Sequence, residues 1–204
     1  MANSARYRYL VSRIKGLEKR LMPKLKALGD YTPTENDLIR AYRLMAHAEF
    51  ESYFEDRSIQ IAANALKSYK RRGHCGRVLA ALMTFSPLAP QSPPSSLNTN
   101  AKFDDPISRV HRVVAQFSTT VRDLNHGIKE ANIIGMLYPI GLTETDLDAT
   151  FLNTLDSYGQ NRGLSAHQSI KAQQPIDPVT ELKMVNDLIR EVQKLDLKLQ
   201  ALID

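Results

Sequence analysis

Apolar residues recur every three or four positions along most of the chain, which is the spacing of amphipathic helices. Clear runs of this kind cover residues 7–28, 34–72, 106–124 and 178–204. No segment keeps the strict alternation of apolar and polar residues that marks a half-buried strand. The pattern therefore predicts an all-α fold built from packed helices.

The two ends of the chain carry similar apolar stripes. Near the N-terminus the stripe consists of Leu10, Ile14, Leu17, Leu21, Leu25 and Leu28. Pro23 is expected to kink or divide this helix. Near the C-terminus the stripe consists of Val179, Leu182, Val185, Leu188, Val192, Leu195, Leu199 and Leu202. Such spacings are typical of coiled-coil seams, so the two ends are expected to pair, within one chain or between two.

A long helix is predicted between the first stripe and the middle of the chain. Thr34 and Asp37 resemble a capping pair at its start, and the helix is expected to run to about Arg72. Its apolar residues are too many for one narrow seam: Leu38, Tyr42, Met45, Phe50, Tyr53, Phe54, Ile61 and Leu66. The helix is therefore expected to be central and to pack on more than one side.

The middle of the chain predicts shorter helices around one long loop. Four prolines among Ser, Asn and Gln at residues 86–105 indicate a surface loop. Short helices are expected at residues 76–85, 106–124 and 128–137. Thr143 and Asp146 signal the start of a further helix.

The net charge is unevenly distributed along the chain. The formal net charge is +5, whereas residues 1–30 alone carry +6, from eight basic and two acidic residues. Such a basic arm can contact RNA phosphates, an acidic partner or anionic lipid, and a solvated helix face explains it equally well. Residues 67–77 hold a second basic cluster around His74 and Cys75, which can contact phosphate, and a solvated helix end explains it equally well. The candidate RNA-binding residues are Arg13, Lys19, Arg20, Lys70, Arg71 and Arg72.

Several classes of protein are disfavoured by what the sequence lacks. Cys75 is the only cysteine, so neither an internal disulfide nor a cysteine-based zinc cluster is expected, and a reducing cytoplasm is the expected compartment. No apolar run is long enough to span a bilayer, and residues 1–8 do not read as a secretion signal. The five histidines form no His-x-x-x-His pair, and no glycine-rich nucleotide loop is present. The sequence predicts neither a metal nor a cofactor.

Arg162 and His167 form the pair with the most specific chemistry. A guanidinium keeps its charge and can stabilise a dianionic phosphorane, and an imidazole with an ordinary pKa of about 6.5 can move protons at neutral pH. Gly159, Gln160 and Asn161 are expected to interrupt the preceding helix, so the pair is expected at the start of a new one. Free backbone N–H groups at such a start favour an anion.

The spacing of the pair limits how the two side chains can act together. Five steps along a regular helix would put them about 140° apart around the axis. Either Gly163 loosens the first turn, or the pair acts in a cleft between two helices or two subunits, which points to a dimer. The alternative interpretation is that Arg162 caps or pairs with a neighbouring helix and His167 is an ordinary surface residue.

Three segments together resemble the HEPN superfamily, and most closely its RiboL-PSP branch: residues 40–51 in the long helix, residues 125–129 ahead of 137–141, and residues 162–167. The resemblance covers residues 34–170, with the 86–105 loop inside it. The basic arm of residues 1–30 and the heptad helix of residues 178–204 lie outside it. The resemblance therefore implies a HEPN-like helical bundle with long terminal helices outside the core.

The resemblance also implies an activity. Active members are metal-independent endoribonucleases, often in toxin–antitoxin or anti-phage systems, and they form homodimers in which two Arg-x4-His motifs meet at one cleft. It assigns Arg162 and His167 as catalytic. His47 and Glu51 lie four residues apart on one helical face and are auxiliary candidates. The motif commonly has a polar residue after the arginine, whereas this chain has Gly163, so Gln160, Asn161 or Ser165 is expected to substitute.

The first hypothesis is therefore cleavage of single-stranded RNA by attack of the ribose 2′-OH, which leaves a 2′,3′-cyclic phosphate. An antitoxin or a defence-complex subunit is the expected partner, and no membrane is involved. The alternative is a non-catalytic helical dimer module that binds a protein or a nucleic acid. The paired terminal stripes and the basic arm favour that alternative.

Overall fold

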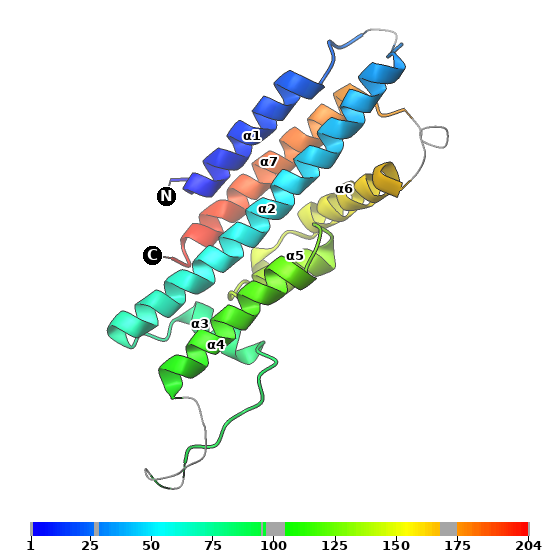
Figure 1. The fold of residues 1–204 in the computed structure, drawn as a ribbon. Helices are drawn as coiled ribbons and strands as arrows, with labels where there is room; N and C mark the ends of the chain where they lie inside the picture. Colours follow the sequence, from blue (N-terminus) through cyan, green and yellow to red (C-terminus); the bar gives the residue numbers. More distant parts are fainter. Residues whose placement is uncertain (1, 27–28, 95, 97–104, 168–174, 204) are drawn as a thin grey trace.

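The computed structural model describes residues 2–26, 29–94, 96, 105–167 and 175–203, and for residues 162–167 it describes the backbone only. The described residues form helices and contain no strand, which confirms the all-α prediction (Figure 1). The α-helices are α1 (Ala5–Leu21), α2 (Pro33–Arg72), α3 (Arg77–Thr84), α4 (Pro106–Thr119), α5 (Glu130–Leu137), α6 (Ala149–His167) and α7 (Pro178–Gln200). A π-helical turn, η1 (Thr120–Leu124), extends α4, and a 3-10 turn, η2 (Glu144–Asp146), precedes α6.

The ends of α1 and α2 follow from local chemistry. Helix α1 ends at Leu21, just before Pro23, and residues 22–26 are not helical, so the helix is shorter than the predicted 7–28 and Leu25 is exposed. Helix α2 starts two residues before the predicted capping pair, because Thr32 and Glu35 cap it reciprocally and Pro33 suits its first turn. A hydrogen bond from Lys26, together with those from Thr32, lowers the pKa of Glu35 to about 2. Gly73 ends α2 at φ +66°, a left-handed conformation that favours glycine.

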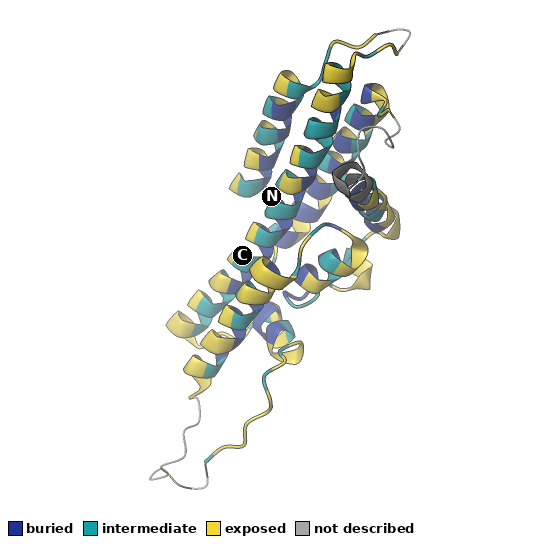
Figure 2. Cartoon of the chain, turned by 45° about the vertical axis from the view of Figure 1, so that its right-hand side comes forward, coloured by how far each residue is buried: buried dark blue, intermediate teal, exposed yellow. Residues whose placement is uncertain are grey.

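Helix α2 is the centre of the bundle, as its many apolar positions predicted (Figure 1). Helices α1 and α7 pack along one side of it, and α3, α4, α5 and α6 pack against the rest. Arg6 of α1 pairs with Asp56, and Arg13 pairs with Glu49, so α1 runs antiparallel to α2. The buried side of each helix faces this interior, and exposed residues cover the outside (Figure 2).

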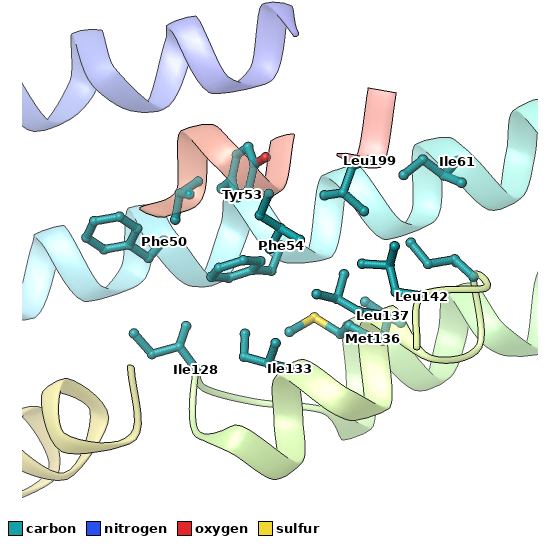
Figure 3. Packing of buried hydrophobic residues seen from close by; sticks show 14 of the residues in the cluster. Phe50, Tyr53, Phe54, Ile61, Ile128, Ile133, Met136, Leu137, Leu142 and Leu199 are labelled. Carbon is teal, nitrogen blue, oxygen red and sulfur yellow. The ribbon is translucent and has the colours of Figure 1, made fainter. Parts of the chain in front are cut away.

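A single hydrophobic cluster connects these helices. The cluster includes Phe50 and Phe54 of α2, Ile133 and Met136 of α5, and Leu199 of α7 (Figure 3). All five of these side chains are fully buried. Removing a side chain of this size from water stabilises a fold by about 1.5–3 kcal/mol. The cluster therefore fixes how α5 and α7 sit against α2.

The terminal helices belong to this core, which corrects the expectation that they lie outside it. Leu10, Ile14 and Leu17 of α1 are at most 1% exposed, and Val185 and Leu188 of α7 are fully buried. The physical reason is that both stripes are too apolar to be left in water, and α2 offers each of them a face. The predicted pairing of the two ends occurs within one chain, because Tyr7 donates a hydrogen bond to the carbonyl of Ile189 at 3.3 Å.

A buried carboxylate connects three helices inside this core. Asp196 of α7 is fully buried, and it accepts hydrogen bonds from the Ser4 backbone N–H and hydroxyl, both at 2.7 Å, and from the Tyr53 hydroxyl at 2.8 Å. The Nε atom of Arg57, which is 1% exposed, lies 3.2 Å from the same carboxylate. Burial and the nearby Asp196 raise the pKa of Tyr53 well above its usual value. The hydroxyl therefore stays protonated and remains a donor.

Asp196→Ala is expected to destabilise the protein by about 3–5 kcal/mol, because it leaves the Arg57 charge buried without its partner. Urea unfolding of the purified protein measures this loss. The half-buried Asp187 is the control, since its ion pairs join it to Lys183 and Arg190, four and three positions away on α7. Asp187→Ala should leave the unfolding midpoint close to that of wild type. Equal midpoints for the two variants would contradict the role assigned to Asp196.

Candidate functional site

The Arg-x4-His motif lies at the C-terminal end of α6. The helix runs from Ala149 to His167 without a break, so the predicted interruption at residues 159–161 and the predicted new helix at residue 162 are both wrong. A helix interior tolerates a single glycine, and Gly159 is buried beside Ile128 and Lys129, where an added Cβ atom would lie 3.8 Å from Ile128 Cγ1 and 3.4 Å from Lys129 Cγ. The expected helix N-terminus is therefore absent at this site, and any charge that attracts a phosphate has to come from side chains.

The helical backbone fixes where the motif positions stand around α6. Position 162 follows Tyr158 by four residues and lies on nearly the same face, which packs against α2. Position 167 follows Tyr158 by nine residues and lies about 180° away around the axis. One α6 helix therefore presents positions 162 and 167 on different faces. The side chains of Arg162, Ser165 and His167 lie outside the described residues.

Tyr158 anchors this part of α6 on α2. Its ring stacks on the ring of His47, with centroids 6.2 Å apart and planes at 26°, and it meets Phe50 edge-on. Its hydroxyl donates a hydrogen bond to the carbonyl of Arg43 at 3.3 Å. Burial and the nearby Glu181 raise the pKa of Tyr158 well above its usual value. His47 thus lies directly beneath α6, one helical turn before position 162.

Glu51 connects α2 to the turn at residues 125–127. Its Oε1 atom accepts a hydrogen bond from the Gly127 backbone N–H, and its Oε2 atom lies 3.7 Å from His47 Nδ1, within ion-pair range but too far for a hydrogen bond. Gly127 has φ +104°, which other residues rarely adopt. Asn125 and Asn132 exchange two further hydrogen bonds, at 2.7 and 2.8 Å. Two of the three segments quoted above, residues 40–51 and 125–129, therefore meet at Glu51.

The other auxiliary candidates differ in position. Gln160 is exposed and donates a hydrogen bond to Asp156 Oδ2 at 2.5 Å, so it is directed along its own helix. Asn161 is half-buried. His47 and Glu51 therefore lie close together beneath α6, whereas the side chain of Gln160 does not contact them.

The candidate RNA-binding residues fall into two separate groups. Lys70, Arg71 and Arg72 are exposed in the last turn of α2, roughly 36 Å along the helix axis from His47. Lys19 and Arg20 are exposed in the last turn of α1, which runs toward the opposite end of α2. Arg13 is paired with Glu49 at 2.7 Å, so part of its charge is neutralised. The two groups do not form one continuous surface with His47.

A cluster that sequence analysis missed lies beside Glu51. One potential ligand atom from each of Glu51, Glu55 and His126 lies within 4.8 Å of the others, a geometry that could hold a divalent cation. Burial, with the nearby Glu51 and Asp56, raises the pKa of Glu55. The two glutamates lie four residues apart on α2, but His126 reaches them only through the tertiary fold. No spacing rule would have found the set.

Comparison with known proteins gives one match. The profile of the RiboL-PSP-HEPN family matches residues 8–201, which takes in α1 and nearly all of α7 as well as the segments between them. Neither the curated proteins nor the solved structures include a match to the chain. Within the part of the chain that the structure describes, no helix combines the length and apolarity needed to cross a bilayer.

Gly159→Ala is expected to stabilise the protein by about 0.5–1 kcal/mol, because alanine loses less backbone entropy in a helix interior. Its Cβ atom would make ordinary van der Waals contacts with Lys129 Cγ at 3.4 Å and with Ile128 Cγ1 and the Lys129 backbone nitrogen at 3.8 Å. Chemical unfolding gives the change in free energy. Gly73→Ala is the matched control and should destabilise the protein, because φ at Gly73 is +66°. A loss of stability in Gly159→Ala would show that α6 is broken at this position.

Glu55→Gln is expected to stabilise the protein at neutral pH and to have little effect below pH 4.5. The folded-state pKa of Glu55 is raised above its ordinary value of 4.5, so its ionisation destabilises the fold as pH rises through the folded pKa. Thermal unfolding at pH 4 and pH 7.5 measures both effects. Glu191→Gln is the control on an exposed helix face. The same shift at both pH values would argue against a titration effect.

Proposed function

Because the chain belongs to the RiboL-PSP-HEPN family, we propose that it is an endoribonuclease that cleaves single-stranded RNA without a metal ion. In this reaction the ribose 2′-OH attacks the adjacent phosphorus, and the bond from phosphorus to the 5′ oxygen of the next nucleotide breaks. The products are a 2′,3′-cyclic phosphate and a free 5′-OH. The requirement for the 2′-OH makes the reaction specific for RNA over DNA.

In this proposal Arg162 and His167 are the catalytic residues. An imidazole can take the proton from the 2′-OH and can return one to the leaving 5′ oxygen. The arginine fork can donate two hydrogen bonds to the phosphorane and offset its added negative charge. Since the motif stands at the C-terminal end of α6, the helix dipole gives no help to an anion there. The guanidinium therefore has to supply most of the electrostatic stabilisation.

The observation that supports a dimer is the unbroken backbone of α6. Positions 162 and 167 stand about 140° apart around one helix, so a single α6 presents them to different surroundings. A two-fold axis beside the end of α6 would set position 162 of one chain near position 167 of the other. A homodimer with a composite cleft is therefore the proposed active form.

His47 and Glu51 act as positioning residues in this proposal. The stack of His47 on Tyr158 holds the last part of α6 against α2, and Glu51 holds the turn at Gly127 against the same helix. Together they fix the direction in which α6 leaves the bundle. The exposed basic residues at the end of α2 stand roughly 36 Å along the helix from His47, so they have no role at the cleaved linkage in this proposal. A toxin or an anti-phage effector, held in check by a partner protein, is the biological role that fits this activity.

His167→Ala is expected to abolish cleavage of single-stranded RNA in EDTA, and Arg162→Ala to slow it by roughly 100- to 1,000-fold. Gel analysis of a labelled oligonucleotide measures the rate, and the cyclic phosphate is identified at the 3′ end of the product. His111→Ala, which changes an exposed histidine on α4, is the control and should cleave like wild type. Undiminished cleavage by correctly folded His167→Ala protein would refute the assignment.

Mixing the two inactive variants tests the composite site. If each site takes Arg162 from one chain and His167 from the other, random re-pairing should restore roughly a quarter of the wild-type sites. Half of the dimers would then be mixed, and one of their two sites would be intact. The mixture is assayed beside each variant alone at equal total concentration. No gain in activity, with subunit exchange demonstrated, would place both residues in one chain.

A lack of cleavage by the wild-type protein, together with stable binding of a co-encoded protein, would favour the non-catalytic module instead. The basic α1 surface around Lys19 and Arg20 is then the part to test for binding.

A further inference from the structure

Side chains from the end of α2, the start of α3 and the end of α7 line a large hollow. Its volume is about 990 Å³, in the range of sites that hold nucleotide-sized ligands. Basic side chains from three segments surround it: Lys67, Arg71, Arg72, His74, Arg77 and Lys198. These residues define what we call the basic hollow. Arg71 is roughly 36 Å along α2 from His47, so this feature is separate from the candidate site on α6.

The charge of the basic hollow is not balanced locally. Among the described residues that line it, Asp146 is the one acid, against five lysines and arginines. Asp146 already accepts a hydrogen bond from Arg77 at 2.8 Å, and its carbonyl accepts one from Lys198 at 2.6 Å. Lys67 and Arg71 stand on α2, one turn apart and exposed. An excess of four positive charges around one concavity favours a ligand with several negative charges.

The start of α3 adds backbone donors to the same hollow. Gly76, Arg77 and Val78 line it, and no side chain caps this helix at its N-cap residue Gly76. The first backbone N–H groups of a helix lack partners within it and bind phosphate well. Arginine adds paired donors that match phosphate oxygens. The basic side chains and the first backbone N–H groups of α3 therefore both offer hydrogen-bond donors to a ligand in the basic hollow.

The floor of the hollow is apolar. Val78 and Leu142 are at most 5% exposed, and Leu202 and Ile203 close the side formed by the end of α7. A surface that only tracked an RNA strand would spread its cations along a stripe. Here they surround a hollow with an apolar base, which suits a compact ligand with a charged group and a less polar body.

We propose that the basic hollow binds a linear di- or triphosphate group, carried by a nucleoside or free as inorganic polyphosphate. The site lies away from the α6 motif and does not depend on the proposed nuclease activity. The phosphates would lie between Arg71, Lys67 and the start of α3. A nucleoside, when present, would contact the half-buried Leu202 and Ile203 above the apolar base of the hollow.

Calorimetry on the full-length protein tests the proposal with three probes: ATP, tripolyphosphate and a single-stranded RNA oligonucleotide. Wild type is expected to bind ATP and tripolyphosphate, and Lys67→Ala with Arg71→Ala is expected to weaken both by about tenfold or more. Tighter binding of ATP than of tripolyphosphate would indicate that the nucleoside occupies the apolar floor. Equal affinities would assign the binding to the phosphates alone.

The matched control is Lys15→Ala with Lys24→Ala, which removes the same charge from exposed positions outside the hollow. It should bind both probes like wild type, and unfolding midpoints should show that both double variants are folded. The proposal is overturned if neither probe binds, or if the two double variants bind alike. It is also overturned if RNA alone depends on Lys67 and Arg71, since the surface would then be a strand-binding one. RNA cleavage is scored separately, so a loss in one assay does not imply a loss in the other.

Discussion

The fold depends on the carboxylate of Asp196, which joins the start of α1, the middle of α2 and the end of α7 at one buried point. Hydrophobic burial supplies most of the stability, but it is not directional, and heptad-like stripes can slide along one another. The buried Asp196 can bond to Ser4, Tyr53 and Arg57 at the same time in only one register of the three helices. The ion pair of Arg43 with Glu181 fixes the other end of α7 on α2 in the same way. The three-helix side of the bundle is thus held at two points roughly 20 Å apart.

The two candidate sites lie at different points along α2. Beneath α6 it presents His47 and Glu51, which lie within reach of Tyr158 and Gly127. At its C-terminal end it presents the cations of the basic hollow. The rigidity of a long helix packed on several sides keeps these regions apart, so ligands at the two places need not compete. Any influence of one on the other would have to pass through α2 itself or through α7, which reaches both ends.

The sequence predicted the helices well, because their apolar spacing and caps are local signals. It predicted the central role of α2 and the pairing of the chain ends for the same reason. It was wrong about α6, because a glycine inside a helix is unfavourable but tolerated, and the buried setting of Gly159 beside Ile128 and Lys129 is not visible in the sequence. It also missed the buried Arg57 and Asp196, although Asp196 lies on the apolar stripe of α7 and could have been noticed there.

The cluster of Glu51, Glu55 and His126 could not be predicted, since it exists only once α2 and the turn after η1 are in contact. The catalytic roles of Arg162 and His167 stay a prediction.

The contact between Ser4 and Asp196 spans 192 positions along the chain. Closing so long a loop costs entropy that only a nearly complete bundle can offset. Local contacts of α2 with α3 and of α4 with η1 can form early, whereas docking of α1 and α7 is expected late in folding. During synthesis on a ribosome, Ser4 can bind Asp196 only after residue 196 has been made and released from the exit tunnel. A chain that has not yet added α7 would therefore lack the support for α2, the helix that carries both candidate sites.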